Sequence, residues 1–275
     1  MANLKEVRNR ITSVISTQQI TKAMKMVAAA KLRRAQGRII DLRPYASHLN
    51  GILQNVSVAL AGDEISNVYA EEREIESVLI VTITSDRGLC GGFNSNIIKK
   101  TRKLIERKYS AQLQAGKVTI LPIGKKAFEA FQRQGLPMKE DFYSLQATKV
   151  IPFQEVKKAA EFAMDGFVAG DFDAVELVYN EFKNVAVQIL HTDQFLPIPK
   201  AEETEEKAVN TDYIFEPSKL EIMEELIPKS LKIQFFKSVL ESNASEQGAR
   251  MTAMEQATEN AGELLKELRL TYNRA

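Results

Sequence analysis

The chain has 275 residues, a formal net charge of +1, 44% hydrophobic residues and 27% charged residues, a composition that excludes intrinsic disorder. No apolar run approaches the roughly 18 residues of a membrane-spanning helix, so we expect no direct membrane insertion, and the polar opening segment indicates no secretion or transit signal. The single cysteine, Cys90, excludes an internal disulfide and fits a reducing compartment, and with only His48 and His191 the sequence indicates no Cys/His metal site.

A heptad pattern runs through the first part of the chain. Apolar residues recur at alternating steps of three and four from Leu4 to Leu60, and only Gln18, Thr21 and Lys25 interrupt them. At about 1.5 Å per residue this predicts a helix of roughly 85 Å, which is far longer than the helices of a globular domain. Such a repeat is typical of a coiled coil, and a coiled coil needs a partner helix.

The same spacing returns at the other end, from Ile233 to Tyr272, with one slip at Ala244 that changes the supercoil locally. The first helix leads into the middle of the chain and the last helix leads out of it. We therefore predict that the two pair as an antiparallel hairpin on a central domain. The alternative is two amphipathic helices lying separately on a globular core, but a helix of roughly 85 Å is too long for it. We expect Pro44 and Pro228 to kink the two helices.

The segment from Ile20 to Leu32 carries apolar side chains on every face of its helix. One partner helix cannot cover such a segment, so we expect a sleeve supplied by other chains. The simpler explanation is that alanines are good helix formers, although methionines beside alanines favour a smooth contact surface. Residues 1–45 also hold ten Lys or Arg against Glu6 and Asp41, a net of +8, which fits a solvated face, an acidic protein surface or nucleic acid.

Strands and helices alternate between the two long helices, which predicts an α/β fold: a central Rossmann-like α/β domain with a mostly parallel sheet and a hairpin around Asn184. We divide the chain into shaft helices at 1–61 and 213–275 and a base domain at 62–212. The predicted strands are Val78–Ile83, Val118–Leu121, Ala174–Tyr179 and Val185–Leu190, with a short extended piece from Lys149 to Phe153. The predicted helices run from about Ser95 to Tyr109, from Lys125 to Gln134 and from Gln154 to Ala169.

A glycine-rich loop, residues 85–94, follows the first strand. A strand, a glycine-rich loop and a helix can cradle phosphate. However, Gly88, Gly91 and Gly92 match neither common phosphate-binding spacing, so a tight turn between sheet and helix is favoured. We expect Cys90 to be a small apolar residue rather than a nucleophile. We find no catalytic constellation, no metal motif and no cofactor motif, which favours a mechanical or scaffolding protein over an enzyme.

Three segments then identify a family. The first helix contains RNRITSVISTQQITKAMKMVAAAKL, the central loop reads SDRGLCGGFN, and the last helix contains ESNASEQGARMTAMEQATENA. In these motifs, and over essentially its whole length, the chain resembles the gamma subunit family of rotary F-type ATP synthases. The resemblance implies that the helix pair is the axle inside a ring of three alternating alpha and beta subunits. It would couple proton-driven rotation of the c ring to conformational cycling of the catalytic beta subunits.

The resemblance also implies contacts and a location. The beta-subunit contacts would be Met24, Lys25, Cys90 and Arg250, and the contacts on the c-ring and epsilon side would be Tyr213 and Glu216. The chain would be a non-catalytic, peripheral subunit without a cofactor, at the cytoplasmic face of a bacterial inner membrane. Family members usually continue for several helical turns past the equivalent of Ala275, so contacts of that tip cannot be carried over. The cysteine-bearing regulatory insert of chloroplast members is missing.

Two functions of other classes compete with this interpretation. A coiled-coil protein that binds nucleic acid would explain the basic first segment, but not the apolar segment from Ile20 to Leu32. Tyr45 is the only aromatic residue available there for base stacking. An α/β enzyme with helical arms would need a catalytic site, which the sequence does not provide.

Overall fold

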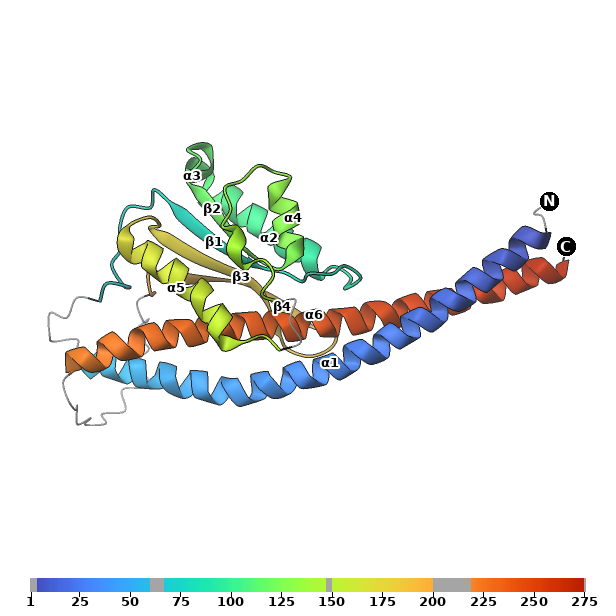
Figure 1. The fold of residues 1–275 in the computed structure, drawn as a ribbon, viewed down its shortest axis with the longest axis horizontal. Helices are drawn as coiled ribbons and strands as arrows, with labels where there is room; N and C mark the ends of the chain where they lie inside the picture. The colour runs from blue at the N-terminus through green and yellow to red at the C-terminus, as the bar shows by residue number, and fades with distance from the viewer. Residues whose placement is uncertain (1–3, 60–66, 147–149, 200–218, 275) are drawn as a thin grey trace.

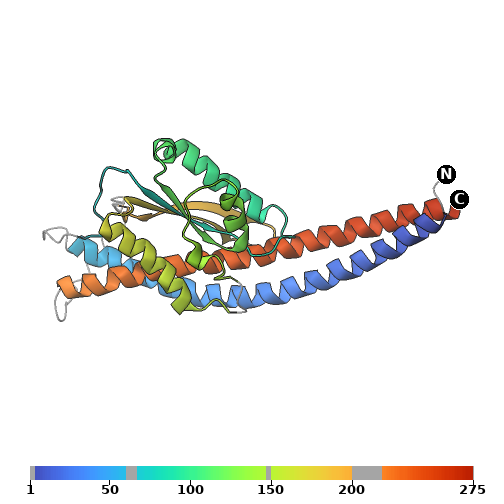
Figure 2. The ribbon, with the colours of Figure 1, turned by 45° about the horizontal axis from the view of Figure 1, so that its top comes forward.

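The structure is a computed structural model that describes residues 4–59, 67–146, 150–199 and 219–274 (Figure 1). Two 56-residue helices, α1 (Leu4–Ala59) and α6 (Lys219–Arg274), run antiparallel and side by side. The two ends of the chain lie together at the far tip of this pair, which we call the shaft (Figures 1 and 2). The predicted antiparallel pairing of the terminal helices is therefore confirmed.

The heptad frame predicted the seam of the shaft. Among the α1 residues whose burial the structure describes, the buried apolar ones all belong to this frame: Val7, Ala28, Leu32, Ala35, Ile39 and Leu49. Both helices continue through their prolines, Pro44 and Pro228, and Figure 2 shows a gradual curve along the pair where we expected local kinks. A proline removes one backbone hydrogen bond, and packing along the remaining length of each helix keeps it continuous.

The base domain contains a four-stranded sheet in the order β2-β1-β3-β4. β1 pairs in parallel with β2 and β3, and β4 pairs antiparallel with β3 as a hairpin. The sheet is thus mostly parallel, as predicted. The strands are β1 (Val78–Ile83), β2 (Val118–Ile123), β3 (Ala174–Phe182) and β4 (Gln188–Leu196).

Helices cover both faces of the sheet, and the shaft supplies part of one covering layer. One apolar core joins the sheet to α5, to α6 and to the middle of α1, and a second core joins the opposite face to α2 and α4. The shaft and the base domain therefore share a core. The base-domain helices are α2 (Phe93–Lys108), α3 (Ser110–Gln114), α4 (Lys125–Gln132) and α5 (Phe153–Ala169), with a short 3-10 helix at Glu140–Phe142.

The second hairpin strand was predicted at the wrong place, because β4 begins at Gln188 and not at Val185. The side chain of Asn184 accepts hydrogen bonds from the backbone N–H groups of Ala186 and Val187, at 2.9 and 2.8 Å. These bonds hold the turn closed for three residues beyond Asn184, so the apolar residues there lie in the turn.

The predicted extended piece before α5 was also wrong. Val150–Pro152 form no strand, and α5 begins directly at Phe153. Pro152 occupies the N-cap position with extended dihedral angles, so the extended signal belonged to a helix start. The limits that we predicted between shaft and base domain, at residues 61–62 and 212–213, lie outside the described residues.

Candidate partner-binding surface

Between Ile20 and Val27, helix α1 exposes three large apolar side chains. Ile20, Met26 and Val27 are 59%, 61% and 56% exposed, whereas Ala28 is buried against α6. We call these three exposed residues the collar. Met24, one of the predicted contact residues, lies among them and is half-buried. An exposed apolar group on an isolated helix pair is typical of a surface that a partner covers.

The polar residues that interrupt the heptad frame pair across the shaft. Thr258 of α6 donates a hydrogen bond to the hydroxyl of Thr21 at 2.8 Å, and Gln18 donates to the carbonyl of Thr258 at 3.4 Å. Lys25, another predicted contact residue, forms an ion pair with Glu255. These pairs fix the register of the two helices and place Met24 close to the height of Met254. They also mean that the charge of Lys25 is already partnered within the chain.

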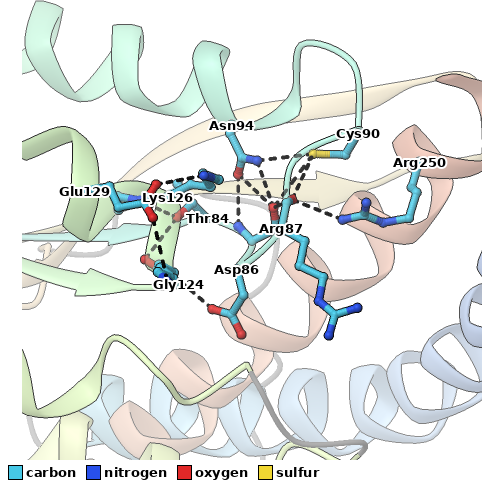
Figure 3. Close-up of polar contacts among 12 residues, drawn as sticks. Thr84, Asp86, Arg87, Cys90, Asn94, Gly124, Lys126, Glu129 and Arg250 are labelled. Carbon is cyan, nitrogen blue, oxygen red and sulfur yellow. Dashed lines mark hydrogen bonds and ion pairs between the residues drawn. The ribbon is translucent and has the colours of Figure 1, made fainter.

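The glycine-rich loop is held by its own side chains (Figure 3). Asn94 accepts from the backbone N–H of Ser85 at 2.9 Å and donates to the Cys90 sulfur at 3.2 Å. Asp86 accepts from the N–H of Lys125, the first residue of α4, at 3.0 Å, and so caps that helix. The side chain of Asp86 therefore serves local structure.

Cys90 points into the protein and Leu89 points out. The Cys90 side chain is only 2% exposed, and burial raises the pKa of its thiol. Leu89 is 65% exposed and has a φ of 63°, a left-handed conformation that is costly for a leucine. A partner at this loop would meet Leu89 rather than the thiol of Cys90. The sequence carried no signal for Leu89, because a strained backbone cannot be read from residue types.

Arg250 anchors the same loop to α6. Its guanidinium donates to the backbone carbonyl of Arg87 (Figure 3) and to that of Gly88. It also forms an ion pair with Glu246, and both side chains of this pair are nearly buried. Burial raises the pKa of the Glu246 carboxyl, and the pairing with Arg250 opposes that shift. Its guanidinium therefore holds the loop in place against α6.

The glycines of the loop form a turn between sheet and helix, which is the interpretation that their spacing favoured. Gly91 has a φ of +58° and makes a tight turn into α2. The hydroxyl of Ser242 donates to the carbonyl of Ile83 at the end of β1, and Ser245 donates to the carbonyl of Asn180 in β3. Helix α6 thereby fills the edge of the sheet where doubly wound domains hold ligands.

Two predicted contact residues, Tyr213 and Glu216, lie outside the described residues. Within the described part of the chain, no group of three metal-ligating side chains is placed to hold an ion. No helix there is both long enough and apolar enough to cross a membrane.

Comparison with known proteins gives a consistent result. The sequence profile of a family described as "ATP synthase" matches residues 3–275. The chain is 58% identical to the "ATP synthase gamma chain" of Cytophaga hutchinsonii and 46% identical to that of Chlorobaculum parvum; in both cases the match covers 100% of this chain and 93% of the relative.

A solved structure has the same fold. It is a chain from the central stalk and c-ring of the Tetrahymena thermophila mitochondrial ATP synthase, with a TM-score of 0.63 and 25% sequence identity. The similarity covers 86% of this chain and 99% of that chain.

Proposed function

The chain belongs to the ATP synthase gamma chain family, and we propose that it turns as the central-stalk rotor inside a ring of alpha and beta subunits. In this role it is a non-catalytic subunit. It couples proton-driven rotation of a c ring to conformational cycling of the catalytic beta subunits, and ATP hydrolysis drives the same rotation backwards.

The observation that carries the proposal is the collar. Ile20, Met26 and Val27 project from a two-helix shaft whose polar seam residues are already paired with each other. A sleeve of surrounding subunits would cover these apolar side chains without needing a fixed set of hydrogen bonds. Contact of this non-directional kind suits a surface that must slide.

The shape of the molecule supports a mechanism. The base domain lies on one side of the shaft, against α6, and the shaft curves (Figures 1 and 2). A shaft of this asymmetry presents a different face to each of three chemically identical beta subunits. Each orientation then favours a different conformation and nucleotide affinity at each site, which is a population shift with a coupling free energy.

The family resemblance supports a more detailed set of contacts. We assign Met24, Lys25, the loop of Cys90 and Arg250 to the beta side, with Leu89 as the exposed contact of that loop. Tyr213 and Glu216 are assigned to the c-ring and epsilon side. The shaft would comprise 1–61 and 213–275, and the base domain 62–212. The complex would lie at the cytoplasmic face of a bacterial inner membrane, with this chain peripheral to it.

The test is co-assembly with the alpha and beta subunits of the same enzyme, measured by native mass spectrometry and ATP hydrolysis. We expect one copy of the chain per ring of three alpha and three beta subunits, with hydrolysis restored. Val27→Asp should weaken this assembly about tenfold or more, because a carboxylate would be buried without a partner.

The matched control is Val168→Asp, since Val168 is 48% exposed on α5 of the base domain, comparable to 56% for Val27 on the collar. We expect the control to assemble like the unmodified chain. Rings that hydrolyse ATP equally well without the chain, or equal effects of the two substitutions, would contradict the proposal.

A further inference from the structure

Three residues within about one turn of α6 are bonded to the carboxyl ends of β1 and β3. Ser242 donates to the carbonyl of Ile83 at 3.3 Å and Ser245 to that of Asn180 at 3.1 Å. One oxygen of Glu241 accepts from the backbone N–H of Phe182 at 3.1 Å. Glu241, Ser242 and Ser245 are completely buried. The end of the sheet is therefore hydrogen-bonded to the shaft.

Arg43 brings the second shaft helix to the same point. Its guanidinium donates to both oxygens of Glu241, from Nε at 2.8 Å and from Nη2 at 2.9 Å. Nη2 also donates to the carbonyl of Phe182 at 2.9 Å. A single buried carboxylate thus connects α1, α6 and the last residue of β3.

These contacts differ in kind from the apolar core that the shaft and the sheet share, although bonds from Arg250 and Lys232 also join α6 to the base domain. The shared core between shaft and sheet is apolar, and apolar contact resists separation but has no preferred direction. A two-pronged pair between arginine and carboxylate has a fixed geometry and resists sliding and rotation. The bonds of Arg43 and Glu241 are therefore suited to holding the base domain at one angle on the shaft.

We propose that Arg43, Glu241 and the end of β3 form the joint that transmits torque between the shaft and the base domain. This proposal depends on the rotor function proposed above. Arg43 and Glu241 are positioning residues in it. They set the angle between two parts of the rotor, while other residues touch the surrounding subunits.

The test uses the complete enzyme in membrane vesicles, with ATP hydrolysis and ATP-driven proton pumping measured on the same sample. For Arg43→Met and Glu241→Gln we expect assembly and hydrolysis like those of the unmodified enzyme, and at least a twofold loss of protons pumped per ATP. Arg43→Lys keeps the charge but loses the two-pronged geometry, so it should give a smaller loss of protons pumped per ATP. This variant serves as the test if Glu241→Gln does not fold.

The control is Lys158→Met, which breaks an exposed ion pair with Glu155 on α5 of the base domain. It should leave the pumping ratio unchanged. An unchanged number of protons pumped per ATP in Arg43→Met and Glu241→Gln would contradict the proposed joint. Failure of the unmodified chain to support pumping would instead overturn the rotor function.

A covalent bridge separates a mechanical role from a general loss of stability. A Cβ atom added at Gly248 of α6 would lie 3.8 Å from the Cα atom of Val185 in the hairpin turn, a separation within reach of a disulfide. In a Glu241→Gln enzyme that also carries Val185→Cys and Gly248→Cys, oxidation should restore the pumping ratio and reduction should lower it again. If the oxidised enzyme stays uncoupled, the joint is wrong.

Discussion

The residues that looked most like free binding groups are largely committed inside the chain. Lys25 is paired with Glu255, Arg250 with Glu246 and the loop, and the Cys90 side chain is buried. The collar and Leu89 remain exposed, and so do basic residues of α1 beside the collar, such as Lys22 and Arg33. At this scale the binding surface offers both apolar area and positive charge.

Glu246 gives a prediction about pH. Burial raises the pKa of its carboxyl above the usual value of 4.5, against the opposing effect of Arg250. The folded chain then holds this proton more tightly than the unfolded chain, so the contribution of Glu246 to stability is present below about pH 4.5 and is lost as the pH rises through the raised pKa. Replacement by glutamine removes the titration and leaves an oxygen that can accept from Arg250.

The measurement is the free energy of unfolding in urea for the unmodified chain and for Glu246→Gln, between pH 4 and pH 7. We expect the unmodified chain to lose stability relative to the variant as the pH rises across this range. If the difference in free energy of unfolding between the two chains stays constant over this range, or changes in the opposite direction, the effect of Arg250 is at least as large as that of burying the carboxyl.

The sequence named candidate contact residues, but it did not reveal their partners within the chain. Motif resemblance named Lys25, Cys90 and Arg250, yet Lys25 meets a residue 230 positions away and Arg250 one 162 positions away. Such pairs depend on the register of two helices from opposite ends of the chain. A local pattern cannot supply that register to within one turn.

At the scale of elements, apolar runs and caps were the reliable signals. The predicted strand Val78–Ile83 matches β1 at both ends, because an apolar, β-branched run bounded by polar residues has few alternatives. Helix α5 ends at Ala169, as predicted, and the C-cap residue Gly170 has a φ of 82°. The start of β4 was missed because Asn184 closes the turn with its side chain, a choice that local apolar content does not reveal.

Gly124 gives a prediction about the turn between β2 and α4. Its φ is +101°, and a Cβ atom there would lie 2.0 Å from the carbonyl oxygen of Thr84. Gly124→Ala should therefore add a steric clash to the backbone strain and lower the free energy of unfolding by about 3 kcal/mol or more.

Gly135→Ala is the matched control, since Gly135 has a φ of +69° and no atom within 4 Å of an added Cβ. It should cost only the strain, about 1–2 kcal/mol. Both values come from urea denaturation of the purified chains. Equal losses for the two variants would mean that the β2–α4 turn shifts to accept the extra methyl group.

At the scale of the whole molecule, the heptad repeats predicted a long antiparallel shaft and a separate α/β fold in the middle. They did not predict that α6 packs across the sheet and shares its core, because α6 uses one face for α1 and another for the base domain. A heptad describes only the first of these faces. The buried polar residues Glu241, Ser242 and Ser245 belong to the second.

The central claim is that this chain rotates as one body inside a ring of subunits. The most direct measurement fixes the ring of alpha and beta subunits to a surface and attaches a bead to the base domain through Lys158→Cys, an exposed position on α5. With ATP we expect continuous rotation of the bead in one direction, which stops when ATP is removed. A bead that only fluctuates, while the same rings hydrolyse ATP, would contradict the account.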